Sequence, residues 1–70
     1  MHLQKSDADR FMLKVTTREL DALQAGLRET IELLDDREFQ TRAGIERAEM
    51  EEILDSLVAQ RKAIRQADDA

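Results

Sequence analysis

The sequence lacks the residue types that commonly cross-link, kink or ligate small domains. Cys, Pro, Trp and Tyr are absent from the 70 residues, and His occurs once, at position 2. Without Cys, disulfides are excluded and nothing in the composition indicates an oxidising compartment. A lone His2 cannot form a zinc site. Because a chain of this length buries only about 60% of its unfolded surface, oligomerisation is the remaining route to stability.

Aromatic residues and long apolar runs are equally scarce. Phe11 and Phe39 are the only aromatic residues, which argues against stacking platforms for bases and aromatic-lined ligand pockets. No apolar run approaches the roughly 20 residues that span a bilayer, and the N-terminus lacks the segment order of a signal peptide. We therefore expect a soluble, cytoplasmic protein that does not contact membranes.

Signatures of catalysis are missing from the sequence. Ser6 and Ser56 have no neighbouring base, and Gly26 and Gly44 are isolated, so neither a nucleophile setting nor a phosphate-binding loop is present. The numerous carboxylates fall on surface that we expect to be exposed, where their pKa values stay ordinary. We predict that the protein is not an enzyme and binds no cofactor.

Charge is unevenly distributed along the chain. Residues 29–55 contain ten acidic and three basic side chains, whereas the whole chain has a net charge of −5. Calcium or magnesium would need several oxygens held in fixed convergent positions, and nothing fixes those of Glu49, Glu52 and Asp55. We predict a solvated acidic surface without a metal. Arg37 and Arg42 lie among these acids, where they either pair with carboxylates or bind a ligand.

Two amphipathic helices account for most of the chain. Apolar residues recur at helical spacing over about 17–36 and again over about 46–66. A short polar link makes the helices antiparallel neighbours with a shallow crossing angle near 20°. Folding the chain about Arg42 predicts four layers, which are Leu20 with Ile64, Leu27 with Leu57, Ile31 with Ile53, and Leu34 with Met50.

The ends of the two helices have recognisable signals. Thr16 and Glu19 have the spacing of a capping box, which satisfies free backbone N–H groups at a helix start. Residues 37–45 form the predicted link, in which Phe39 closes the end of the hairpin core. Gly44 is expected to permit the turn into the second helix.

The N-terminal part differs in pattern. Residues 1–9 show no period and are predicted to be a flexible lead-in. Residues 10–16 alternate, with Phe11, Leu13 and Val15 on one side, which is typical of a short half-buried strand. Since we find no second strand-like run, the predicted partner is the same segment of a second subunit across a two-fold axis. The alternatives are an extra helical turn or an ordered coil lying on the helices.

The apolar surface of the second helix is too wide for one facing helix. Leu54 and Val58 extend it to about 140° at 100° per residue, and Leu33 adds an apolar side chain to the first helix. We therefore predict an all-α domain over 10–66 that dimerises into a four-helix bundle, followed by a frayed tail, 67–70. The predicted oligomer interface consists of Phe11, Leu13, Val15, Leu33, Leu54 and Val58.

One segment suggests an alternative. The order strand, helix, helix and the run Arg10-Phe11-Met12-Leu13-Lys14-Val15-Thr16 resemble the ribbon-helix-helix repressors and antitoxins, dimers whose paired N-terminal strands enter the major groove. The resemblance implies that Arg10, Met12 and Lys14 face bases. Phosphate neutralisation drives such binding, whereas the net charge here is negative.

Our leading hypothesis is therefore a small acidic interaction module of the accessory, adaptor or inhibitor type. It would be a homodimer or a higher homo-oligomer, with an unidentified protein as a possible further partner. The ribbon-helix-helix reading is the alternative.

Overall fold

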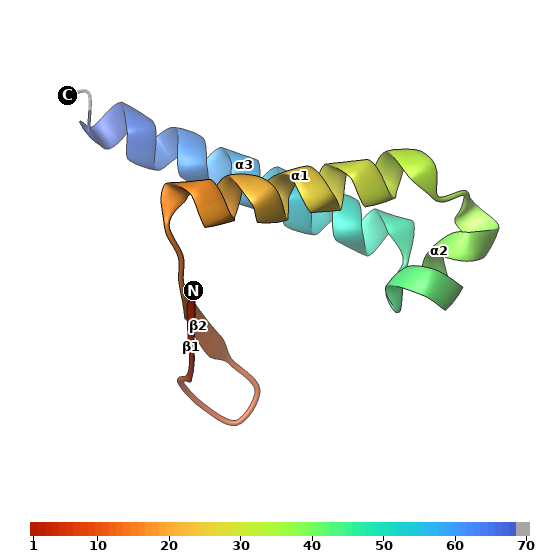
Figure 1. Ribbon diagram of the computed structural model, residues 1–70, viewed down its shortest axis with the longest axis horizontal. Helices are drawn as coiled ribbons and strands as arrows, with labels where there is room; N and C mark the ends of the chain where they lie inside the picture. The colour runs from red at the N-terminus through yellow and green to blue at the C-terminus, as the bar shows by residue number, and fades with distance from the viewer. Residues whose placement is uncertain (69–70) are drawn as a thin grey trace.

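The computed structural model describes residues 1–68, which form two strands followed by three helices. The elements are β1 (His2–Lys5), β2 (Phe11–Lys14), α1 (Thr17–Leu33), α2 (Asp36–Ala43) and α3 (Arg47–Asp68). The long helices α1 and α3 lie side by side, α2 connects them at one end, and the strands project from the other end (Figure 1). The mainly helical prediction is confirmed, with a small antiparallel sheet added.

Helix α1 begins where its capping box places it. The Thr16 Oγ1 accepts a hydrogen bond from the Glu19 N–H at 3.1 Å, and Glu19 Oε1 accepts one from the Thr16 N–H at 2.9 Å. These reciprocal bonds satisfy backbone donors that a helix start leaves free. The prediction of this cap is confirmed.

The predicted link is largely helical, which corrects the boundaries of both long helices. Asp35 caps α2 by accepting a hydrogen bond from the Glu38 N–H at 2.8 Å, so the chain is already extended at Leu34 and α1 ends before 36. Gly44 ends α2 with φ 79°, in the left-handed region that favours glycine. The turn at Gly44 was predicted, but the helix preceding it was not.

The side of α3 that faces α1 is rotated from the predicted one. Leu54 is half-buried, whereas Ile53 is 51% exposed. Arg47, Met50, Leu54, Leu57 and Arg61 define the inner stripe, at steps of three and four residues. The predicted place of Ile53 in the core is therefore wrong. Leu34 and Met50 line one depression together, as their predicted layer requires.

The N-terminal segment pairs within the chain, which corrects the prediction of a flexible lead-in and an intersubunit strand partner. β1 runs antiparallel to β2, with Leu3 opposite Leu13 and Gln4 opposite Met12. In the connecting loop, the N–H groups of Ser6 and Asp7 both donate to the Arg10 carbonyl, at 3.0 and 3.3 Å. The single large apolar residue of β1 gives no period. The signal that could have indicated the hairpin is the Ser and Asp residues of the loop, which are turn formers.

The core is very small. Among the described residues only Phe39, 1% exposed, and Met50, 8% exposed, are buried. Phe39 lies in α2 and Met50 in the first turn of α3, so the tightest packing is at the end where α2 connects the long helices. Part of the predicted tail is helical, since α3 continues to Asp68, and residues 69–70 lie outside the described part.

Candidate interaction surface

Arg47 joins three parts of the connected end. Its guanidinium donates to the carbonyl of Leu34 and lies 5.4 Å from the ring centroid of Phe39. Its Nε is 3.0 Å from Asp36 Oδ1, but the N–H group is not aligned for a hydrogen bond, so this pair is electrostatic. One side chain therefore holds the start of α3 against α2 and the end of α1.

Arg61 joins α3 to α1 in the other half of the molecule. Its two terminal nitrogens donate to Gln24 Oε1 and Asp21 Oδ1, each at 2.7 Å. The Arg61 side chain is 20% exposed, so it occupies the inner stripe where an apolar residue would be expected. Together with Arg47 it sets the rotation of α3 about its own axis.

Glu19 connects the sheet to the helices. Its Oε2 lies 2.9 Å from the amine of Met1, while Oε1 caps α1 at Thr16. Hydrogen bonding to the Met1 amine, followed by that to the Thr16 N–H, lowers the pKa of Glu19 from 4.5 to about 2. The carboxylate thus ties the β1 end of the hairpin to the first turn of α1.

The predicted interface residues are distributed over three regions. Phe11 and Leu13 are exposed on β2, and Val15 beyond it is half-buried. Leu33 is 75% exposed at the end of α1. On α3, Val58 is exposed, but Leu54 belongs to the inner stripe. The structure therefore does not gather these six residues into one surface.

The β-hairpin has one apolar and one polar side. Side chains of paired residues share a side, and positions two apart on a strand do so as well. The register therefore places Leu3, Phe11 and Leu13 together, with Lys5 opposite Phe11 at the edge of this side, and we call the three apolar residues the hairpin face. The opposite side carries Met12 and Lys14, two of the residues that the ribbon interpretation selected, along with His2 and Gln4. Arg10, the third selected residue, lies in the loop just before β2.

The layer formed by α1 and α3 has two unlike flanks. Asp21 of α1 lines a depression together with Val58, Lys62 and Arg65 of α3, which identifies one flank. We call this the charged face. At 100° per residue the other flank collects mostly apolar, small and uncharged polar side chains. These are Leu23, Gly26 and Thr30 of α1 and Ile53, Ser56, Gln60 and Ile64 of α3, and we call them the Ile53 face.

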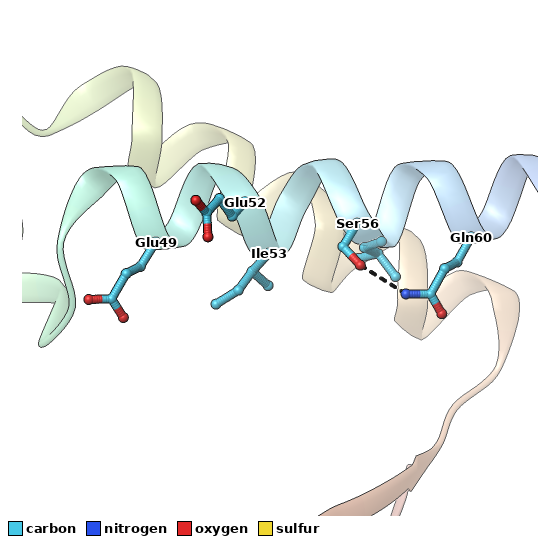
Figure 2. A pocket seen from close by; sticks show the side chains of 6 residues that line it. Glu49, Glu52, Ile53, Ser56 and Gln60 are labelled. Atoms are coloured by element: carbon cyan, nitrogen blue, oxygen red, sulfur yellow. Dashed lines mark hydrogen bonds between the residues drawn. The ribbon is translucent and has the colours of Figure 1, made fainter.

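The Ile53 face is exposed in this structure. Ile53 and Ile64 are 51% and 63% exposed, and Leu23 is exposed as well. A shallow open depression follows α3 here, with Glu49 and Glu52 at its acidic end and Ser56, Leu57 and Gln60 beyond Ile53. Figure 2 shows Glu49, Ile53 and Gln60 projecting from one side of α3, with Gln60 Nε2 donating to Ser56 Oγ at 2.9 Å. Only α3 lines this depression.

The acidic residues and the two predicted arginines make few fixed contacts. Within residues 1–68, no cluster of three His, Asp or Glu side chains has a metal-binding arrangement. Arg42 Nε lies 3.8 Å from Glu38 Oε2 in an exposed pair on α2. The described residues provide no carboxylate within 4.0 Å of Arg37. Arg42 therefore pairs with a carboxylate, as one of the two interpretations predicts, whereas Arg37 is exposed to solvent.

Comparisons with known proteins do not place this chain in a family. No family model, curated protein or solved structure matches it. Among the helices of the described part, none combines the length and apolar character needed to cross a bilayer. Ile53 and Ile64, which the structure leaves exposed, were predicted to be buried in layers with Ile31 and Leu20. The signal that could have corrected this is Arg61, which the apolar periodicity ignored.

Proposed function

We propose that this protein is a non-enzymatic interaction module that works as an oligomer. The observation that carries the proposal is the large solvent-accessible surface area of the single chain. The chain exposes 5998 Å², whereas a compact folded monomer of 8.1 kDa is expected to expose about 4,500 Å². The excess of about 1,500 Å² per chain is comparable to what each subunit buries in a permanent homodimer.

The excess area is apolar in a manner that favours association. Among residues 1–68, ten large hydrophobic side chains are exposed and two are buried. An isolated two-stranded hairpin is marginally stable in water, yet the hairpin face of Leu3, Phe11 and Leu13 is uncovered. Surface of this kind marks sites of protein association in soluble proteins. An accessory, adaptor or inhibitor role would use such surfaces without catalysis.

Light scattering over a dilution series tests this proposal. We expect a molar mass of twice 8.1 kDa or a higher multiple at micromolar concentrations, decreasing only on strong dilution. A mass that corresponds to one chain at every concentration would contradict the proposed oligomer.

DNA binding is a second candidate, because the polar side of the hairpin carries Met12 and Lys14 opposite an apolar side. The order of elements here differs from the strand, helix, helix order of the ribbon-helix-helix proteins, because a second strand, β1, precedes β2 and pairs with one of its edges. A random-duplex gel shift on the same sample, repeated with Arg10→Glu and Lys14→Glu, separates the two functions. A DNA-binding hairpin would shift the duplex in a salt-dependent manner and lose affinity on charge reversal. The interaction module would assemble unchanged and leave the duplex free.

A further inference from the structure

We propose that a second copy of this chain packs on the Ile53 face across a two-fold axis and completes a four-helix bundle. This inference rests on the proposed function and adds the identity of the partner and the surface that it covers. It also replaces the sequence-predicted helical contacts at Leu54 and Val58 with contacts on the opposite flank of α3.

The distribution of charge selects this flank. The charged face carries Asp21, Lys62 and Arg65, which would have to be desolvated under a partner, and burying charges without ideal pairing is costly. The Ile53 face presents two isoleucines, a leucine and small or amide side chains along its middle. Its charged neighbours lie toward the connected end, where Glu49 and Glu52 border the α3 depression and Glu29 and Arg42 border the one beside Gly26 and Thr30. Depletion of charge at the centre is the compositional mark of an interface core.

The shape of the face permits close approach of another helix. Gly26 lies on this side of α1, and a Cβ added there would have nothing within 4 Å. Thr30 and Ser56 are also short, and each hydroxyl group already makes one hydrogen bond within its own helix. Thr30 donates to the Gly26 carbonyl at 2.8 Å, and Ser56 accepts from Gln60 at 2.9 Å. Covering these groups therefore leaves their hydrogen bonds intact.

The available area agrees with a second copy as the occupant. A standard-size interface takes about 800 Å² from each partner, which lies within the excess of about 1,500 Å² that each chain exposes. In a two-fold contact the same patch meets itself, so the excess exposed area of both chains is reduced by the same amount. Packing two such hairpins face to face gives the four-helix bundle, in which each helix contacts two neighbours.

The decisive experiment places one carboxylate on each flank of α3. Ile53→Glu changes the Ile53 face, and Val58→Glu is the matched control on the charged face, because both residues are β-branched and already exposed. We expect Ile53→Glu to raise the dimer dissociation constant at least 100-fold, while Val58→Glu changes it less than fivefold. Circular dichroism checks that both variants retain the helical content of the wild type.

Cysteine labelling provides a second measurement that leaves the apolar residues intact. Because the chain lacks Cys, Ser56→Cys on the Ile53 face and Lys62→Cys on the charged face each introduce one exposed thiol. In the assembled protein we expect a bulky maleimide to modify position 56 at least tenfold more slowly than position 62. This difference should disappear on dilution to monomer.

The outcomes separate the two proposals. A wild-type oligomer that persists in Ile53→Glu, with equal labelling at 56 and 62, would overturn this inference and leave the proposed function in place. A wild-type protein that is monomeric at all concentrations would overturn both. An oligomer lost in Ile53→Glu and kept in Val58→Glu, with position 56 protected, would support both.

Discussion

At the residue scale, a few long polar side chains perform the role that apolar residues perform in larger cores. Arg47 bonds to Leu34 and lies over Phe39, and Arg61 reaches across to Asp21 and Gln24. Arg suits such positions because its planar group can donate several hydrogen bonds and cover an aromatic ring at once. The α1–α3 contact is therefore specified as much by hydrogen-bond geometry as by apolar area.

Replacing Arg47 with Ala should be among the most destabilising changes at the connected end. The variant loses a charge-assisted hydrogen bond worth about 1.5–3 kcal/mol and the contact with the Phe39 ring. Urea denaturation measures the loss in free energy of unfolding. Arg42→Ala is the control, since its exposed pair with Glu38 contributes about 0–1 kcal/mol. Equal losses in the two variants would show that Arg47 is not a structural anchor.

The lowered pKa of Glu19 predicts that the contact between the β-hairpin and α1 depends on pH. Its pKa falls to about 2 in the folded protein, from an ordinary 4.5. A carboxyl group whose folded-state pKa is lowered contributes stability above its unfolded-state value, and that contribution is lost as the pH falls. We expect the hairpin to detach from α1 between pH 4.5 and 2, as followed by NMR shifts of Thr16 and Leu3. In Glu19→Gln, the shifts should lack this transition.

At the scale of elements, caps decide where α1 begins and where α2 begins and ends. Thr16 and Glu19 start α1, Asp35 starts α2, and Gly44 stops α2 with a positive φ. The cap side chains bond backbone groups three residues away, and the Gly44 N–H bonds the carbonyl of Gln40, four residues back, so all of these contacts are local. This is why the first cap and the glycine stop could be recognised without knowledge of the tertiary structure.

The loss of stability on replacing Gly44 should depend on how well the new residue tolerates a positive φ. Nothing lies within 4 Å of an added Cβ, so the cost arises from φ 79° alone. We expect Gly44→Ala to lower the free energy of unfolding by about 1–2 kcal/mol. Gly44→Asn should lose less, because Asn tolerates the left-handed region. Thermal unfolding of the two variants provides the comparison, and a loss in Asn equal to that in Ala would contradict the conformational explanation.

At the scale of the whole molecule, the balance between core and surface governs behaviour. Among residues 1–68 only two side chains are buried, so half-buried contacts must offset much of the conformational entropy of folding, and the proposed association would add to them. The exposed area makes this chain's stability depend on what covers it. The Ile53 face and the hairpin face are the surfaces where that cover is expected.

The midpoint of thermal unfolding should therefore rise with protein concentration. Association stabilises the folded state by mass action, so dilution shifts the equilibrium toward unfolded chains. Scanning calorimetry between roughly 5 µM and 500 µM should show this dependence in the wild type and its absence in Ile53→Glu. A midpoint that is the same across this range in the wild type would indicate a protein that is stable as a monomer.

The local features of this protein follow from short-range patterns in its sequence. Periodicity located the two long helices, the spacing of Thr16 and Glu19 identified the start of α1, and Gly44 identified a turn. The alternation at 10–16 also predicted an extended segment, of which 11–14 is a strand. These features could be predicted because each depends on groups within a few residues of one another.

The tertiary structure decided what each element faces. β1 is defined by its pairing with β2, because four residues with a single large apolar side chain have no period of their own. The rotation of α3 depended on Arg47 and Arg61 finding partners 13 to 40 residues away. Apolar periodicity shows that a helix has an apolar stripe. It does not show which part of that stripe faces the neighbouring helix when polar side chains such as Arg47 and Arg61 belong to the contact. That rotation is what leaves Ile53 and Ile64 open to a partner.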